Sequence, residues 1–363
     1  MTEEMLTNAA ADDLLIGLVQ RYSPSMQEGA AVNYLVAWMN AHGFDADVDA
    51  AGNAVGVLGQ GERTLLLLGH IDTVPGFIEV RRENGGVGGN RDGAGGKLYG
   101  RGTVDAKGPL AAFTAAAARA GEQAGKRIVV VGAVEEEAAT SKGARFLLDR
   151  LTPEAVIIGE PSRWNRLTVA YKGRLLVDYR LSRPIGHTAG PGSGVCEEAF
   201  AFWAAVQAYA AEHNLGRDRL FDQLSPSLRA MHAEDDGFHE TATLTLGLRL
   251  PEEADIAALQ AHLVALSGDA QITCRGYEPA YRAAKSTHLA RAFIRAIEAE
   301  GARAQFKVKS GTSDMNVVGP VWNCPILAYG PGDSALDHTP HEHIDLDEYH
   351  RAIAVLERVL IHI

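Results

Sequence analysis

The chain has 363 residues, of which 46% are hydrophobic and 22% charged, as in an ordinary globular protein of about two domains. Its formal net charge of -12 argues against a general affinity for nucleic acid or for an anionic membrane surface.

The cysteines also limit the class of protein. Cys196, Cys274 and Cys324 lie far apart and form no CxxC motif, which excludes a disulfide framework and a cysteine-rich zinc site. We find no basic segment followed by an apolar core, as in a signal peptide, and no apolar run of the ~20 residues that a membrane span needs. We therefore expect a cytoplasmic protein.

The first half of the chain alternates between patterns typical of helices and of buried strands. Helices are predicted over 13–22, 27–42, 109–120 and 141–150, and strands over 44–57 (with a turn), 64–68, 127–134 and 155–159. The Gly-rich stretch 77–100 is typical of loop and hairpin. This alternation predicts an α/β domain with a doubly wound, largely parallel sheet.

The pattern changes after residue 173. Strands over 174–182, 241–250 and 270–275 alternate with helices over 195–211 and 252–266, and 214–237 is expected to be an irregular insert. Strands that alternate polar and apolar residues predict a small α+β, ferredoxin-like domain with one solvated sheet face. The α/β pattern then resumes, so we expect residues 1–173 and 282–363 to form one domain, with 174–281 inserted.

Acidic and histidine side chains follow the predicted strands. Glu135, Glu136 and Glu137 come directly after the strand at 127–134, where three adjacent carboxylates repel one another and lose hydration. His70 and Asp72 follow the strand at 64–68. Because open α/β sheets bind ligands at the carboxyl ends of their strands, we expect a cation there.

His70 and Asp72 are two residues apart, so on an extended segment they point the same way. His70 can then bind a metal while Asp72 orients its ring, although a purely structural hydrogen bond is the alternative. Asp105 precedes a predicted helix and could be an N-cap, but the glycines around it let the backbone approach another group closely. Glu160 ends another strand, and His338 lies in a polar loop.

Together these donors suit zinc or cobalt in a catalytic site with open positions. Two metals about 3.5–4 Å apart need a bridging carboxylate, for which Asp105 would serve. One carboxylate of the glutamate triple then remains free beside a metal-bound water, as a general base requires. His341 and His343 are expected to be solvated.

The order of these motifs resembles the di-zinc amidohydrolase family of acetylornithine deacetylase, succinyl-diaminopimelate desuccinylase and glutamate carboxypeptidase. The similar stretches are 69–75, 100–108, 135–137, 159–162, 186–189, 311–314 and 338–344. The resemblance implies a catalytic domain with two Zn²⁺ ions per subunit, for which Co²⁺ can substitute. It also implies that the inserted domain is a lid that forms a homodimer.

The resemblance also implies residue roles. His70 and Glu160 would bind one metal, Glu137 and His338 the other, and Asp105 would bridge them. Glu136 would be the general base, Asp72 would orient His70, and His187 would polarise the scissile carbonyl in the partner subunit's site. The substrate carboxylate would be held by Arg249, Gly311, Thr312 and Ser313, although an arginine on a half-exposed strand is otherwise a solvated residue.

One departure from the family leaves an alternative open. The family commonly has Asp-Glu-Glu where this chain has Glu135-Glu136-Glu137, and we align Glu135 with the aspartate in a supporting role. A shift of one residue would make Glu135 the base.

The stretches 132–146 and 169–174 look most like the branch that releases lysine or ornithine from an amino-group carrier protein. The expected activity is hydrolysis of the amide on the α-amine of lysine, in lysine or arginine biosynthesis. The alternatives are a deacylase of acetylornithine or succinyl-diaminopimelate, a dipeptidase, or a metal-binding protein without catalysis, against which the retention of Glu136 argues.

Basic residues lie close to these motifs in the sequence: Arg163, Arg166, Lys172, Arg174, Lys307 and Lys309. They predict a basic rim that docks an acidic carrier protein and speeds encounter. Scattered surface charge is the alternative.

Overall fold

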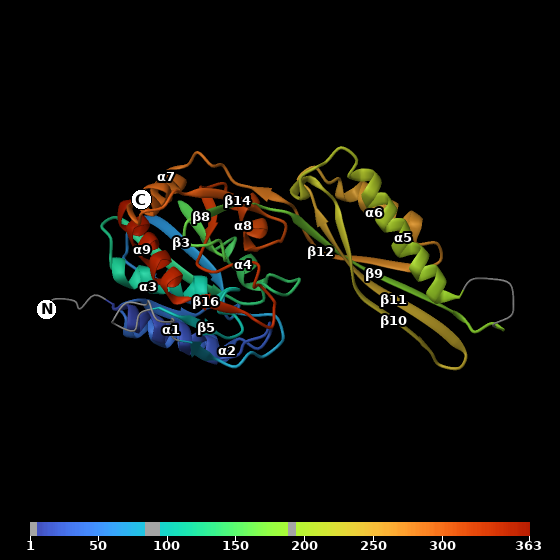
Figure 1. The fold of residues 1–363 in the computed structure, drawn as a ribbon, viewed down its shortest axis with the longest axis horizontal. Coiled ribbons are helices and arrows are strands. Elements are labelled where there is room, and N and C mark those ends of the chain that lie inside the picture. Colours follow the sequence, from blue (N-terminus) through green and yellow to red (C-terminus); the bar gives the residue numbers. More distant parts are fainter. Residues whose placement is uncertain (1–5, 84–94, 188–193) are drawn as a thin grey trace. The chain divides into compact units, whose positions relative to one another are not determined.

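The computed structural model describes residues 6–83, 95–187 and 194–363. The chain forms two compact units (Figure 1). The first comprises Met1–Ala170, Arg282–Val308 and Ser313–Ile363, and the second Tyr171–Tyr281 with Lys309–Thr312.

The larger sheet of the described residues has the strand order β1-β2-β6-β3-β7-β15-β8-β13, with β14 beside β8. The strands are β1 Asp45–Val48, β2 Ala54–Leu58, β3 Arg63–His70, β6 Lys126–Ala133, β7 Ala155–Gly159, β8 Arg166–Tyr171, β13 Tyr281–Arg282, β14 Gln305–Lys309 and β15 Ile326–Tyr329. Strands β6, β3, β7 and β15 are parallel, whereas β1, β2 and β8 pair with their neighbours antiparallel. The prediction of a parallel sheet is thus confirmed for its centre.

The central strands are buried almost throughout, as their continuous apolar runs predict. The helices of this unit are α1 Asn8–Gln20, α2 Gly29–Ala41, α3 Lys107–Ala120, α4 Lys142–Leu147, α7 His288–Ala299, α8 Asp314–Trp322 and α9 Leu346–His362. Helices α1, α3, α9 and α7 pack in succession, and α3 also contacts β3, β6 and β7. One hydrophobic core joins these helices to the sheet.

Two glycines let α3 approach the sheet closely. Gly69 on β3 and Gly159 on β7 are paired across the strands. A Cβ atom at Gly159 would lie 2.9 Å from the Cα atom of Gly69 and 3.0 Å from the ring of Phe113 on α3. The absence of side chains here brings the first turn of α3 towards the carboxyl ends of β3 and β7, where the predicted ligands lie.

A small antiparallel sheet has the order β16-β5-β4, formed by His343–Asp345, Lys97–Tyr99 and Arg81–Glu83. Strands β4 and β5 confirm a hairpin at the two ends of the Gly-rich stretch. The prediction for the stretch between them, 84–94, lies outside the described residues. Strand β16 follows the loop of His338 directly, so this sheet fixes the end of that loop.

The second unit has the order β9 Gly173–Pro184, α5 Val195–His213, β10 Ser225–Asp235, β11 His239–Leu250, α6 Ile256–Leu266 and β12 Gln271–Glu278, with a short 3₁₀ helix Leu220–Asp222 before β10. Its antiparallel sheet has the order β10-β11-β9-β12, and both helices pack on it through one apolar core. The succession β-α-β-β-α-β is that of the ferredoxin-like motif.

Four strands of the described residues were not predicted from the sequence: the short strands β13 and β16, and the longer strands β8 and β10. The prediction of an irregular insert over 214–237 is wrong, because β10 occupies 11 of its residues. This strand lies at a sheet edge and is exposed over nearly its whole length, so it lacks the apolar alternation that marks a half-buried strand. Strand β8 was missed because its five buried residues form a short run without alternation.

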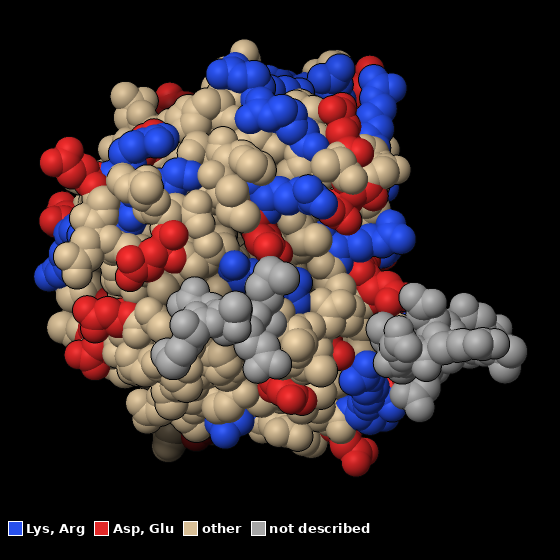
Figure 2. All heavy atoms as spheres, turned by 90° about the vertical axis from the view of Figure 1, so that its left-hand side faces the viewer, with Lys and Arg blue, Asp and Glu red and all other residues tan. Residues whose placement is uncertain are grey.

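Figure 2 shows one face of the molecule, on which basic and acidic side chains lie interspersed. Among the described residues, no helix combines the length and the apolar character required to cross a bilayer.

Candidate metal centre

The predicted ligands of the first unit lie at the carboxyl ends of three adjacent strands. His70 is the last residue of β3, Glu136 and Glu137 follow β6, and Glu160 follows β7. Because β6, β3 and β7 are parallel neighbours, their ends place these side chains together. Two loops, those of Asp105 and His338, complete the set.

Three groups of donors converge there. Their ligating atoms lie within 4.8 Å of one another in each group: His70 with Glu136 and Glu137, His70 with Asp105 and Glu160, and Asp105 with Glu137 and His338. His70, Asp105 and Glu137 each belong to two groups, so neighbouring cation positions would share ligands. The sequence-predicted ligands are thus brought together without exception.

Asp105 lies between two imidazoles. Its Oδ1 atom is 3.3 Å from Nε2 of His70, and its Oδ2 atom is 3.0 Å from Nε2 of His338. The same His338 nitrogen is 2.9 Å from Oε1 of Glu137. Each carboxylate oxygen of Asp105 thus faces a different histidine, as expected of a ligand shared by two cations. Asp105 does not cap α3, because the N-cap residue is Ala106.

Asp72 is fully buried and holds several parts of the site at once. His70 Nδ1 lies 3.0 Å from the Asp72 carbonyl oxygen and 3.4 Å from its Oδ1 atom, so the ring is held through both backbone and side chain. The Asp72 carboxylate also accepts the backbone N–H groups of Glu136 and Glu137. It therefore positions the glutamate pair as well as orienting the histidine.

The pKa values show how strongly these groups act on one another. Hydrogen bonds with Asp105 and Glu137 raise the pKa of His338 to about 11. Burial alone would raise the pKa of Asp105, but hydrogen bonds from His338 and His70 hold it well below its usual range. The imidazoles thus offset part of the negative charge of the converging carboxylates.

Glu136 has a different electrostatic environment. Burial raises its pKa well above the usual range of a glutamate, and the carboxylates of Asp314, Glu160 and Glu137 add to this effect while His70 opposes it. Burial also raises the pKa of Glu137. A carboxyl whose pKa is moved towards neutrality can take up and release a proton at working pH.

Glu135 is engaged elsewhere. It belongs to none of the three donor groups among the described residues. Its Oε2 atom accepts a hydrogen bond of 2.7 Å from the Thr140 hydroxyl, and Lys142 lies 3.5 Å from its Oε1 atom. Its backbone N–H donates to Glu28 and its φ is 60°, a left-handed conformation that turns the chain directly after β6.

Five other predicted site residues belong to the second unit or to its border. Arg249 donates a hydrogen bond of 2.6 Å to the hydroxyl of Thr312, which in turn donates to the carbonyl of Lys172. His187 is exposed and lies beyond the end of β9. Gly311 belongs to the second unit with Thr312, whereas Ser313 belongs to the first, where its hydroxyl caps α8.

The predicted basic rim needs correction. Lys172 is fully buried, and its ammonium donates to the carbonyls of Leu220 and Gln223 and to the hydroxyl of Ser225. The sequence misled here because an isolated lysine is usually solvated, whereas this one satisfies three oxygen acceptors inside the second unit.

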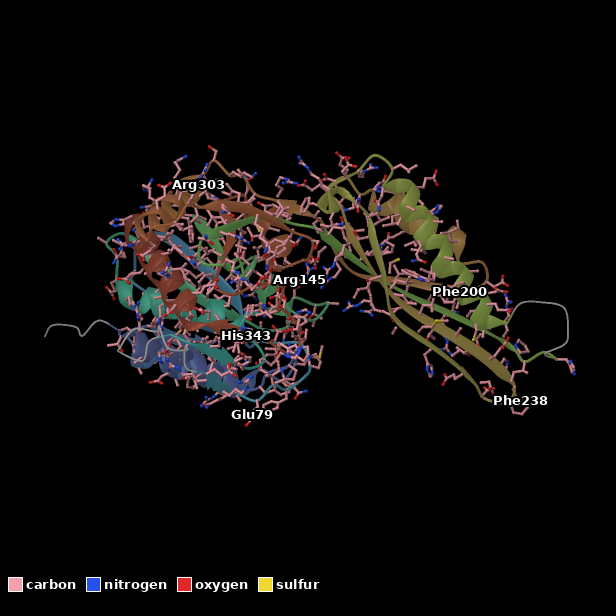
Figure 3. All side chains as sticks on the ribbon, in the orientation of Figure 1. Glu79, Arg145, Phe200, Phe238, Arg303 and His343 are labelled. Carbon is pink, nitrogen blue, oxygen red and sulfur yellow. The ribbon has the colours of Figure 1, made fainter. Side chains whose placement is uncertain are left out.

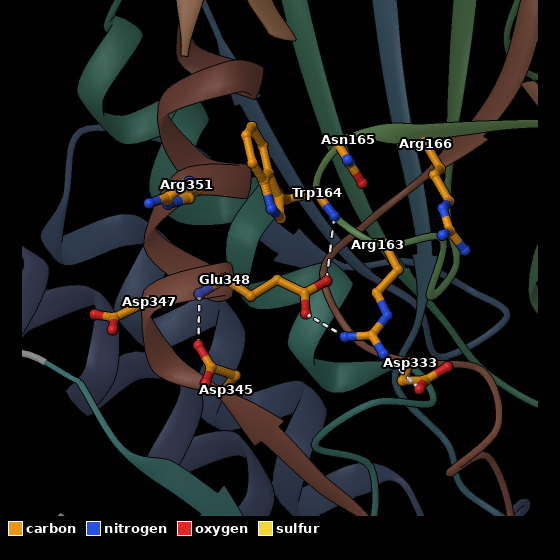
Figure 4. Close-up of a pocket in the computed structure, with 9 residues that line it drawn as sticks. All are labelled: Arg163, Trp164, Asn165, Arg166, Asp333, Asp345, Asp347, Glu348 and Arg351. Atoms are coloured by element: carbon orange, nitrogen blue, oxygen red, sulfur yellow. Dashed lines mark hydrogen bonds and ion pairs between the residues drawn. The ribbon is translucent and has the colours of Figure 1, made fainter. Parts of the chain in front are cut away.

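Arg163 is paired with acidic side chains, so it does not present an unpaired positive charge to a docking partner. It forms ion pairs with Asp333 and Glu348, at the wall of a pocket of about 560 Å³ (Figure 4). Arg166 and Arg351 line the same pocket, together with Asp345 and the acids already named. Acidic side chains thus face the arginines, which favours the alternative of mixed surface charge at this place.

Sequence reasoning missed three residues that hold the site from outside. Ser25 donates a hydrogen bond of 2.7 Å to Asp72, and Glu28 accepts the N–H of Glu135. Glu342 accepts backbone N–H groups from the Asp105 loop. No local pattern marks the first two, because their partners are distant in sequence. Glu342 lies within the matched stretch 338–344, which was the available signal.

The residues present fit a divalent metal. Imidazole and carboxylate donors without thiolates suit zinc or cobalt, and Asp72 supplies the outer hydrogen bond that metal-binding histidines commonly make. Several buried carboxylates also converge here. Their burial is costly without a cation, so their arrangement also indicates a metal site.

Comparison with known proteins is consistent with this geometry. The model of the family described as "Peptidase family M20/M25/M40" matches residues 66–362. A protein of Deinococcus radiodurans named "[LysW]-lysine hydrolase" is 46% identical over 97% of this chain and 96% of its own length. A Saccharolobus islandicus protein named "[LysW]-lysine/[LysW]-ornithine hydrolase" is 28% identical over 95% of this chain and 94% of its own length.

Among solved structures, the M20 family metallo-carboxypeptidase Sso-CP2 from Sulfolobus solfataricus superimposes with a TM-score of 0.75. It is 18% identical and covers 96% of this chain and 98% of its own. The likeness confirms the mixed α/β fold over nearly the whole chain.

The raised pKa of His338 predicts that metal binding releases protons. Below pH 11 this imidazole carries the proton that must leave before Nε2 can bind a metal, so affinity should rise with pH. Between pH 6 and pH 8 we expect the zinc affinity to rise by at least about tenfold per pH unit, one proton being released per ion bound. Calorimetric titration in buffers of different ionisation enthalpy measures this release.

A His341→Ala variant is the matched control, because His341 is exposed in the same loop and belongs to none of the donor groups among the described residues. It should leave the proton release unchanged. A zinc affinity of the unaltered protein that does not vary with pH would contradict the interpretation.

Proposed function

The chain belongs to peptidase family M20/M25/M40, and from this premise we propose that it is a metal-dependent amidohydrolase that releases lysine from an amino-group carrier protein. The bond cleaved would be the amide on the α-amine of lysine. The reaction would belong to lysine biosynthesis, and to arginine biosynthesis where ornithine is released in the same way. The family and the hydrolases among its relatives make the chain a hydrolase of amide bonds.

The observation that carries the proposal is the environment of Glu136. Its carboxyl converges with His70 and Glu137 among donors that suit metal ions, and its pKa is raised well above the usual range by burial. A structural ion cluster would not need a carboxyl with this property beside its ligands. A hydrolase does, because a base must take up a proton from water and return it to the leaving group.

We assign two zinc ions per subunit, for which cobalt can substitute. His70 and Glu160 would hold one ion, Glu137 and His338 the other, and Asp105 would be shared between them. The distances of Asp105 to the two histidines support this assignment. When bound, the ions lower the pKa of a coordinated water and polarise the scissile carbonyl.

The residues of the chain then have separate tasks. Glu136 takes a proton from the attacking water and passes it to the α-amine of lysine as the amide bond breaks. Asp72 holds the His70 ring and the backbone of the glutamate pair, so that Glu136 keeps its position. The contacts of Glu135 with Thr140 and Lys142 support the alignment in which Glu135 has a supporting role.

The identity of the substrate is supported by the relatives. The 46% identical protein is named for lysine attached to LysW, and the Saccharolobus islandicus protein for lysine or ornithine attached to LysW. We propose that such a carrier is the partner of this chain. Arg249, Gly311, Thr312 and Ser313 are proposed to bind the carboxylate of the released amino acid, and the hydrogen bond from Arg249 to Thr312 supports their grouping.

We further propose that the second unit is a lid through which two copies form a homodimer. Its edge strand β10 is exposed and has no described partner on its outer side. Exposed apolar side chains accompany it, including Met231 on β10 itself. Phe238 in the following turn and Phe200 on α5 are also exposed (Figure 3). An edge strand with apolar neighbours suits self-association about a two-fold axis.

Replacement of the proposed base tests the function. A Glu136→Gln variant should lower kcat for carrier-linked lysine by about 10²–10⁴-fold, since the amide cannot take up the proton. Its zinc content should remain that of the unaltered protein. Glu135→Gln is the matched control, one residue away, and should keep kcat within about threefold, because its carboxylate only supports the turn.

The substrates to compare are carrier-linked lysine and ornithine, acetylornithine and succinyl-diaminopimelate. Full turnover by Glu136→Gln with zinc bound would contradict the mechanism. Turnover of a small acylated substrate alone would contradict the carrier assignment and leave the base assignment intact.

Subunit mixing tests the dimer and the role of His187 together. If His187 acts in the site of the partner subunit, His187→Ala and Glu136→Gln subunits are each inactive alone but complement one another. Half of the dimers in an equal mixture are mixed, and each holds one complete site of two, so about a quarter of the original activity should return. Refolding or slow exchange of the two variants, followed by assay, measures it.

His232→Ala is the control for His187→Ala, since His232 is also an exposed histidine of the second unit and has no proposed role. It should be active alone. If sedimentation shows mixed dimers but no activity returns, His187 acts in the site of its own subunit or has no part in catalysis.

A further inference from the structure

Glu342 is a fully buried carboxylate that the proposed reaction does not use. It lies four residues after His338 and just before β16. Its Oε1 atom accepts three backbone N–H groups of one loop, those of Gly102 at 3.0 Å, Val104 at 2.9 Å and Asp105 at 3.0 Å. Successive N–H groups directed at one oxygen form an anion-binding concavity, which here is filled by a side chain of the protein itself.

The second oxygen of this carboxylate is paired with a buried arginine. Arg101 Nη1 lies 2.9 Å from Oε2 of Glu342, and the exposed fraction of Arg101 is 7%. The guanidinium also donates to the carbonyls of Gly76 and Thr339. Glu342 and Arg101 are therefore a satisfied ion pair that joins three loops, and neither charge is free to move.

The loop held by Glu342 is the one that carries the shared ligand. Gly102 has a φ of +91°, and a Cβ atom there would lie 2.9 Å from the side chain of Thr73, so only glycine fits this turn. The N–H of Asp105 is itself one of the three donors. The position of Glu342 therefore sets where the Asp105 backbone lies, and hence where its carboxylate can reach.

Glu342 is also part of the loop of His338. The two ligands that come from loops, Asp105 and His338, are thus tied together through one carboxylate. His70 and Glu160 differ, because each lies at the end of a strand in the centre of the sheet. Their positions are set by the pairing of β3 with β7 and do not depend on this anchor.

We propose that Glu342 is a positioning residue that holds the Asp105 and His338 loops in register. It is required for the metal position formed by Asp105, Glu137 and His338, because it holds the loops of two of these three ligands. The position of His70, Asp105 and Glu160 depends on it less, because only Asp105 is held by this anchor. The proposal rests on the metal assignment made under the proposed function. It adds a residue that touches neither substrate nor metal and acts through the backbone of Asp105.

The chain supplies a closely matched control. Glu348 is also a buried glutamate, whose Oε1 atom accepts the backbone N–H of Trp164 while its Oε2 atom pairs with Arg163 (Figure 4). The Oε1 atom also accepts the N–H of Gly332. It thus makes the same kinds of contact as Glu342. None of these partners belongs to a donor group among the residues that the structure describes.

The experiment compares the zinc content of three proteins: the unaltered chain, Glu342→Gln and Glu348→Gln. Glutamine keeps the shape and one acceptor oxygen but loses the charge that pairs with the arginine. After loading with zinc and gel filtration, the unaltered protein should hold two ions per chain. Glu342→Gln should hold about one, with the second ion bound at least about tenfold more weakly, the usual effect of losing an outer contact.

Cobalt titration followed by visible absorption reports the two positions separately from activity. In Glu342→Gln one set of d–d bands should saturate as in the unaltered protein, and the other should need more cobalt. Glu348→Gln should lose thermal stability to a similar extent and still hold two ions. That difference separates positioning of the site from a general contribution to folding.

Two ions bound by Glu342→Gln with unchanged affinity would overturn the proposal, and so would an equal loss of metal in both variants. If Glu342→Gln does not fold, Glu342→Asp replaces it, since the shorter side chain keeps the charge but cannot span from Arg101 to the Asp105 loop. The same one-ion result is then expected, and retention of both ions overturns the proposal.

The proposed function is judged on the unaltered protein alone, by its zinc content and its hydrolysis of carrier-linked lysine. Its failure is therefore distinguishable from failure of the Glu342 proposal, which is judged on the difference between the variants.

Discussion

The structure depends on the cost of burying several carboxylates within a few ångströms of one another. Glu136, Glu137 and Asp105 meet at one edge of the sheet, and burial alone would raise the pKa of each. Such a cluster is stable only if positive charge lies among the oxygens. The two histidines that face Asp105 supply it in the protein without metal, and metal ions would supply it in the proposed enzyme.

The same cost of burial explains why side chains around the cluster form many hydrogen bonds with the backbone that carries its carboxylates. Asp72 holds the N–H groups of Glu136 and Glu137, and Glu342 holds those of the Asp105 loop. Each of these outer carboxylates is fully buried and satisfied. The cluster is thus positioned by further acids whose own charges are neutralised by hydrogen bonds or by Arg101. This arrangement fixes the reacting groups before any substrate arrives.

Much of the central architecture could be predicted from the sequence. Continuous apolar runs identify β3, β6 and β7, because strands buried on both faces need them. The carboxyl ends of neighbouring parallel strands lie at one edge of a sheet. The sequence therefore predicts that His70, Glu136, Glu137 and Glu160 lie close together. Their roles as ligands and base, and the role of the second unit as a lid, stay predictions.

The features that sequence analysis missed share a physical cause, since each depends on contacts between distant segments. Strand β10 has no apolar periodicity because it is exposed at a sheet edge. Lys172 looks like a surface cation, yet its ammonium is satisfied by carbonyls about fifty residues away. Glu342 looks like one acid in a polar loop, and only folding brings the Asp105 loop to its carboxylate.

Anomalous diffraction at the zinc edge, from crystals of the zinc-loaded protein, would locate the ions that these side chains are proposed to hold. We expect two ions per chain, about 3.5–4 Å apart, that share Asp105. One should lie against His70 and Glu160 and the other against Glu137 and His338, with neither bound by Glu136. A single ion, or an ion coordinated by Glu135 or Glu136, would contradict the account.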